Sequence, residues 1–266
     1  AAEAVRQADL VIFCVPPGAM GAAAREIAEA LPKGALVSDV GSCKQSIAQA
    51  LGEALPGHAV IPAHPVAGTE NSGPDAGFAS LFHNRWCIVT PPAPGTPNAA
   101  DPVLLAGLVQ FWEALGANVE IMDAAHHDLV LAVTSHLPHL IAYTIVGTAS
   151  DLEEVTQSEV IKYSAGGFRD FTRIASSDPT MWRDIFLANK DAVLEMLGRF
   201  SEDVSELTRA IRRGDGQALF DIFTERRAIR RSIVEMGQDS PAPDFGRPHP
   251  GLPSEALPRP YAADQD

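Results

Sequence analysis

The first half of the chain alternates short apolar runs with longer segments in which apolar residues recur at helical spacing. Short continuous apolar runs are typical of strands buried on both faces of a sheet. The strand-like runs are 10–15, 35–40, 59–62, 86–89 and 118–121, and helical spacing covers 20–31, 44–55 and 101–115. Strands separated by helices predict an α/β fold with a parallel sheet covered on both faces.

The second half of the chain loses the strand signal. Helical patterns there cover residues 124–149, 153–163, 179–213 and 215–236. We therefore expect an all-helical C-terminal domain, with the chain divided into residues 1–122 and 123–237. Residues 238–266 carry seven prolines and little apolar content, which is typical of a disordered tail.

The amino-acid composition indicates which binding partners and which cellular compartment to expect. The chain has 266 residues, 46% of them hydrophobic, which is enough for two domains with separate cores. Its 34 acidic and 20 basic residues give a net charge of -14, so nucleic acid is excluded as a partner by repulsion of the phosphates. A small anionic substrate would need a local positive site. The three cysteines form no disulfide framework, which favours the cytoplasm.

The most apolar stretch, residues 129–149, is almost long enough to span a bilayer. It contains His136, Pro138 and His139. Ionisable residues are costly within a membrane. We therefore expect a buried helix with a polar inner face and no membrane partner.

Polar side chains and turn residues follow three predicted strands. Val15 and Pro16 follow the first strand, Asp39 and Ser42 the second, and His64 the third. An open parallel sheet binds ligands at the carboxyl ends of its strands, so these residues are expected to line one crevice. For Ser42 the alternative role, capping the helix that begins near residue 44, stays open.

His64 is the sharpest candidate for chemistry in the first domain. It follows an apolar strand and precedes a proline, so we expect it at a rigid strand tip. A neutral imidazole can accept a proton near physiological pH. A purely structural histidine is the competing interpretation. Two neighbours of Ser42 receive plainer interpretations: Lys44 is expected to be exposed, and Cys43 to be a small packing residue.

A second cluster, residues 134–139, lies in the long apolar segment. His136 and His139 are three residues apart and share a helix face, and Pro138 between them predicts a kink. The spacing differs from that of zinc-binding helices, which place two histidines four residues apart. We therefore favour hydrogen bonds to a substrate and expect no metal.

A third cluster contains Arg173 among small and apolar residues, which predicts a partly buried guanidinium. A buried guanidinium requires an anion. Asp170 is one candidate for that anion, and a carboxylate of the substrate is the other.

Four segments in this order resemble the prephenate/arogenate (cyclohexadienyl) dehydrogenase family. They are VSDVGSCK at 37–44, HPVAGTENSG at 64–73, SHLPH at 135–139 and GGFRDFTRIA at 166–175. The match continues through SDP at 177–179 and MWRDI at 181–185, and the whole resemblance runs from residue 1 to about residue 237.

The resemblance implies oxidative decarboxylation of prephenate or arogenate, with hydride transfer to NAD or NADP, in tyrosine biosynthesis. It also implies a homodimer through the helical domain. At the matching positions, the resemblance implies that His64 accepts the proton of the ring hydroxyl and that Ser42 orients His64. The substrate contacts implied by the family are Arg173, His139, Ser135 and Glu70, and the cofactor contacts are Val15, Pro16, Asp39 and Ser42.

The sequence departs from that family at one motif. The family opens with a strand and a glycine-rich turn that binds the pyrophosphate, but this chain contains no G-x-G-x-x-G. We therefore expect an incomplete Rossmann-type sheet, with a β-α-β unit preceding Ala1. A truncated, non-catalytic or regulatory protein that retains the substrate pocket is one alternative. A β-hydroxyacid dehydrogenase is another, but residues 124–150 lack the lysine that class uses.

Overall fold

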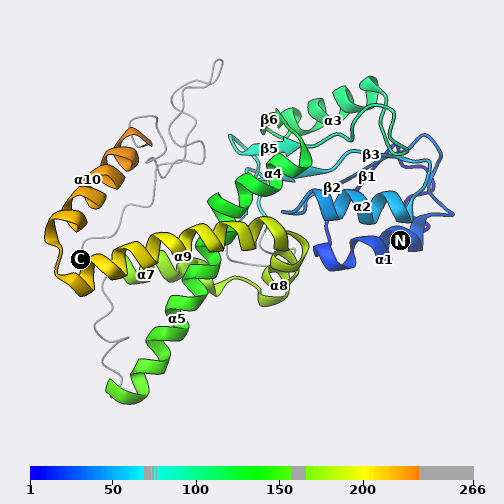
Figure 1. The fold of residues 1–266 in the computed structure, drawn as a ribbon. Coiled ribbons are helices and arrows are strands. Elements are labelled where there is room, and N and C mark those ends of the chain that lie inside the picture. The colour runs from blue at the N-terminus through cyan, green and yellow to red at the C-terminus, as the bar shows by residue number, and fades with distance from the viewer. Residues whose placement is uncertain (69–72, 74, 76, 157–165, 234–266) are drawn as a thin grey trace, which may run out of the picture.

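The computed structural model describes residues 1–68, 73, 75, 77–156 and 166–233, shown in colour in Figure 1. Glu70, the predicted tail 238–266 and most of the predicted helix 153–163 lie outside the described residues. The strands gather at one end of the molecule, and the helices that follow them form a second part (Figure 1).

The first three strands form a parallel sheet in the order β1-β2-β3. The strands and the helices that connect them are β1 (Leu10–Phe13), η1 (Pro17–Ala19), α1 (Met20–Ile27), β2 (Leu36–Asp39), α2 (Gln45–Ala54) and β3 (Ala59–Val60). Alternate strand residues enter two cores: Phe13 and Val37 pack with α1 and α2, whereas Ile12 and Leu36 pack with Trp112 of α3 (Pro102–Ala114). The predicted sheet covered by helices on both faces is therefore confirmed.

A second three-stranded sheet has the order β4-β5-β6 and consists of β4 (Ala63–Pro65), β5 (Trp86–Val89) and β6 (Asn118–Ile121). The segment that contains β3 and β4 joins both sets of strands, because Ile61 N donates to Val37 O. β5 and β6 are parallel, but β4 and β5 are antiparallel, which corrects the expectation of a wholly parallel sheet. A parallel connection needs a crossover, usually a helix. The described residues between β4 and β5 form turns instead, so the chain reverses.

The second part is helical, as predicted. Its elements are α4 (Ala124–Leu131), the π-helical turn η3 (Ala132–His136), α5 (Leu137–Thr156), α7 (Gly166–Thr172), η4 (Arg173–Ser176), α8 (Pro179–Ala188), α9 (Lys190–Arg213) and α10 (Gly216–Ile233). A π-helical turn lies just before Pro138, where the sequence predicts a kink. The predicted helix 179–213 is interrupted at Asn189, whose buried side chain bonds to Asp128 O and contacts His136 Nδ1.

The run from α4 into α5 is long and apolar enough, by length and composition, to cross a membrane: residues Ala124–Asp151 reach a mean hydropathy of 1.6. Its polar inner face is as predicted, since His127, Asp128 and His136 are buried. The expectation of a buried helix is wrong, because only 22% of its most apolar window is buried inside the chain. Its outer face leaves Leu129 and Val146 exposed.

Candidate active site

The loops that follow β1 and β2 lie next to each other and form one side of the candidate site. Phe13 of β1 is in register with Asp39 of β2, so the loops after these parallel strands leave the sheet at the same edge. Ser42 is half-buried in the second loop. A side chain at Gly41 would collide with Ile47, so glycine lets the loop pass tightly against α2 before Ser42.

Beneath these loops lies a buried ion pair. Lys44 Nζ lies 2.5 Å from Asp39 Oδ2 and donates to Ala63 O at 2.6 Å, and both charged side chains are fully buried. Burial raises the pKa of Asp39, although the Lys44 ammonium opposes that shift. The prediction that Lys44 is exposed is therefore wrong, because its ammonium pairs with the buried carboxylate of Asp39. The carboxylate of Asp39, which is predicted to contact the cofactor, faces Lys44 and the N–H groups of Gly41 and Ala63.

The start of α2 is capped by the helical part of the chain. Asp128 of α4 accepts hydrogen bonds from Lys44 N at 2.7 Å and Gln45 N at 3.0 Å, whereas no side chain of the flanking loop caps the helix. The capping alternative for Ser42 is therefore not what the structure has. Burial alone would raise the pKa of Asp128, but hydrogen bonds from His127, Lys44 and Gln45 lower it.

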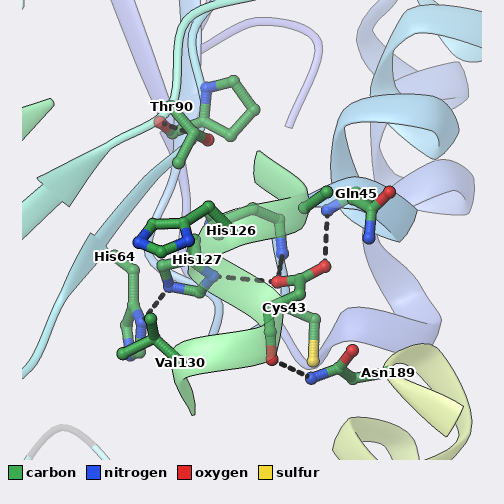
Figure 2. Close-up of polar contacts among 12 residues, drawn as sticks. Cys43, Gln45, His64, Thr90, His126, His127, Val130 and Asn189 are labelled. Carbon is green, nitrogen blue, oxygen red and sulfur yellow. Dashed lines mark hydrogen bonds and ion pairs between the residues drawn. The ribbon is translucent and has the colours of Figure 1, made fainter. Parts of the chain in front are cut away.

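His64 lies inside β4 and is connected to Asp128 through a second histidine. His64 Nδ1 lies 2.8 Å from His127 Nε2, and His127 Nδ1 lies 2.8 Å from Asp128 Oδ1. Figure 2 shows the rings of His64 and His127 directed towards each other, with a dashed line between their nitrogens. Burial, followed by the nearby charge of Lys44, holds the pKa of His64 well below its ordinary value. A neutral imidazole at pH 7 results, as proton acceptance requires.

The second cluster surrounds Trp182 of α8. The ring of His139 stacks on Trp182 with centroids 3.6 Å apart, and the ring of His136 meets it edge-on at 6.1 Å. These contacts support the prediction that the two histidines share a face. His139 Nδ1 lies 2.8 Å from Ser135 O. Burial lowers the pKa of His136 to about 4. Among the described residues, its buried Nε2 has no hydrogen-bond partner.

Arg173 differs from its prediction because its side chain is exposed. The reason is local: neither α7 nor η4 contains a buried residue, so this apolar segment lies on the surface of the chain. Its charge contributes to the lowered pKa of His139, after burial, which indicates that the two side chains are close. Asp170, the predicted internal partner, forms an exposed ion pair with Arg169.

The structure thus brings most of the predicted site residues into one region. His136 links the two clusters, because its Nδ1 contacts Asn189, which bonds to Asp128 O, and its ring meets Trp182 edge-on. Cys43 packs against Trp182 and Ile185, and burial raises its thiol pKa to about 12, which confirms its role as a packing residue.

Sequence reasoning missed His127 and Asp128. A signal for them was present: an adjacent histidine and aspartate near the start of an apolar segment are expensive to bury unless they bond to something. Asn189 was missed as well, although its position inside a predicted helix is unfavourable for asparagine.

An α/β domain with a neutral histidine near its ligand-binding edge, packed against a helical domain, is the architecture of a two-domain nicotinamide-dependent dehydrogenase. Residues 1–121 match the family described as prephenate dehydrogenase, nucleotide-binding domain, and residues 123–225 match its dimerization domain. The chain therefore belongs to the prephenate dehydrogenase family.

Individual relatives agree with this assignment. A cyclohexadienyl dehydrogenase of Zymomonas mobilis is 46% identical over 231 residues, covering 87% of this chain and 77% of that protein. A prephenate dehydrogenase of Bacillus subtilis is 31% identical over 259 residues, covering 94% and 68%. The crystal structure of Aquifex aeolicus prephenate dehydrogenase in complex with hydroxyphenyl propionate and NAD+ superposes with a TM-score of 0.77 at 35% identity, covering 85% of this chain and 76% of that one.

Proposed function

We propose that this protein is an NAD- or NADP-dependent dehydrogenase that converts prephenate by oxidative decarboxylation in the cytoplasmic synthesis of tyrosine. The observation that carries the proposal is His64, a buried neutral imidazole close to the loop that contains Ser42. A neutral imidazole in this position can accept the proton of a ring hydroxyl. Family membership supplies the substrate class.

The residues present fit a bound dinucleotide at its nicotinamide end. Val15 and Ser42 are half-buried in adjacent loops beyond β1 and β2, and Pro16 is exposed beside them. Carboxyl-end loops of this kind bind dinucleotides in open α/β sheets. When bound, the nicotinamide would supply the hydride acceptor. The relative from Aquifex aeolicus has been crystallised with NAD+.

The residues of this chain would divide the remaining tasks. His64 would take the proton from the ring hydroxyl, and Ser42 would hold that hydroxyl or the histidine in position. Arg173 and His139 would bind the carboxylates of the substrate, for which a guanidinium is well suited. The buried Nε2 of His136 has no partner among the described residues, so a polar ligand group there would satisfy it. Ser135 and Glu70 complete the proposed set.

Separate titrations of prephenate and NAD+ test this proposal. We expect the purified protein to bind both and to form NADH, which absorbance records, when both are present. Binding of prephenate without NAD+ would instead favour a regulatory protein that retains the substrate pocket. Arogenate, tested in parallel, decides which side chain the pocket accepts, because the two substrates differ by a keto or an amino group.

We also propose a homodimer formed by the helical domain, residues 123–237. Apolar side chains are exposed on three of its helices, namely Ile145 and Val146 of α5, Leu194 and Ile211 of α9, and Phe220 and Phe223 of α10. Exposed apolar side chains favour a protein–protein interface, and residues 123–225 match a dimerization domain. Light scattering during size exclusion should give twice the chain mass, and Phe220→Glu with Phe223→Glu should shift it towards the monomer.

A further inference from the structure

His64, His127 and Asp128 are joined by two hydrogen bonds in series. The charge state of Asp128 determines which atom donates in each bond. The lowered pKa of Asp128 leaves an ionised carboxylate, which can only accept. His127 must therefore carry its proton on Nδ1, the nitrogen 2.8 Å from Asp128 Oδ1. A neutral imidazole has one ring proton, so His127 Nε2 is a bare acceptor.

The proton position on His64 follows from the same donor and acceptor roles. Its Nδ1 lies 2.8 Å from the bare His127 Nε2, so Nδ1 must carry the proton and Nε2 must be free of it. We propose that His127 and Asp128 are positioning residues that hold His64 in the tautomer with a bare Nε2, the form that can accept a proton. This inference rests on the proposed function for the use of that proton.

The alternative arrangement reverses every bond. A doubly protonated His127 would donate to His64 Nδ1 and place the His64 proton on Nε2, where it could not accept. Two features disfavour it. The His127 ring is fully buried, which penalises a charged ring. Asp128 also already receives two N–H donors from the start of α2, which reduces its demand for a cation.

The proposed proton transfer is balanced within these groups. The proton of the ring hydroxyl moves to His64 Nε2, and the imidazolium formed keeps its Nδ1 proton directed at His127 Nε2. The charge that appears on His64 is thereby stabilised through His127 by the carboxylate of Asp128. This is the role of an orienting carboxylate in a catalytic triad, here with one additional imidazole between base and carboxylate.

The residues come from both parts of the chain, which affects how the inference is tested. His64 belongs to β4 and His127 to α4, and Asp128 also caps α2. Substitution of Asp128 would uncap that helix, so His127 is the informative position. His126 precedes it in α4 (Figure 2). The side chain of His126 is exposed, so His126→Phe is a matched control.

Nitrogen-15 NMR of the histidine rings tests the tautomer without any substrate. In the wild-type protein near pH 7.5, we expect His64 Nδ1 to have the chemical shift of a protonated nitrogen and Nε2 that of an unprotonated one. His127→Phe should give His64 a mixture of tautomers, and His126→Phe should leave it unchanged. A protonated Nε2 on wild-type His64 would overturn the inference, whether or not the protein oxidises prephenate.

Kinetics test the consequence. His127→Phe should lower kcat about 100-fold, because His64 loses its acceptor, with the KM values for prephenate and NAD+ within about twofold, because neither contacts His127. His127→Gln keeps a side-chain carbonyl acceptor and should recover at least about tenfold of that loss. A kcat of His127→Phe near that of His126→Phe would refute the positioning role. No turnover by the wild type would refute the proposed function alone and leave the NMR result to decide the tautomer.

Discussion

Removal of the ammonium of Lys44 should destabilise the protein strongly and in a pH-dependent way. In Lys44→Met, Asp39 stays buried without its cation. Breaking a buried ion pair by removing one partner costs about 3–5 kcal/mol. Asp39 keeps the N–H donors of Gly41 at 2.7 Å and Ala63 at 3.3 Å, so we expect the lower end, about 3 kcal/mol.

The pH dependence of this loss has a definite sign. Burial raises the pKa of Asp39 in the folded state, and Lys44 opposes that rise, so Lys44→Met should raise the pKa further. A carboxyl with a raised folded pKa contributes stability below its unfolded pKa and loses that contribution as the pH rises through the folded value. The penalty should therefore be larger at pH 8 than at pH 5, by about 1.4 kcal/mol per pKa unit of additional shift within that window.

Urea unfolding, followed by tryptophan fluorescence at the two pH values, measures both effects. The double variant Asp39→Asn with Lys44→Met contains no buried charge, so it should be no less stable than Lys44→Met alone. Ile47→Val, a conservative change in the neighbouring core, should cost about 1 kcal/mol at either pH. A penalty for Lys44→Met below about 1 kcal/mol, equal at both pH values, would refute the buried pair.

Three further predictions concern the site. His64→Asn should lower kcat by about 10²–10⁴-fold, as expected for a lost general base, and an unchanged kcat would exclude that role. Arg173→Gln should mainly raise the KM for prephenate, the sign of lost ground-state binding; an unaltered KM would show that the guanidinium serves another purpose. Because the folded pKa of His136 is about 4 against a usual 6.5, its neutral form stabilises the fold above pH 6.5. That contribution, about 3 kcal/mol, is lost as the pH falls through 4, so urea unfolding of His136→Gln should depend less on acid pH than that of the wild type.

The local sequence pattern was sufficient to predict the strands and helices that position the site residues. The apolar run 10–15 contains β1, and the helical spacing at 44–55 contains α2, because burial on a sheet or along one helix face imposes these periods. The order of the strand ends predicts that Ser42 and His64 lie at the same edge of the sheet. The antiparallel pairing of β4 and β5 was not visible in the pattern, since it depends on how the intervening turns return the chain.

The remaining errors concern contacts between segments that are distant in sequence or fold back on each other. Lys44 was expected to be exposed because no pattern indicates that its side chain reaches Asp39 and Ala63. Arg173 was expected to be partly buried because its neighbours are apolar, but Phe171 beside it is itself 43% exposed. Composition reports which residues prefer burial, and only the tertiary fold determines what covers them.

The two parts of the chain are joined by attachments of unequal strength. Asp128 and its neighbour His127 form three hydrogen bonds to the start of α2 and to β4, all at 3.0 Å or less, two of them buried and one partly buried. α8 meets the first part at two points: buried Cys43 Sγ lies 3.6 Å from Ile185 O, and near η1 Gly18 N donates to Asp184 Oδ2 at 3.3 Å in exposed surroundings. Buried charge-assisted bonds cost far more to break than a long exposed one. Any opening between the parts should therefore separate α8 from η1 first, and the alignment of His64 with His127 should persist through it.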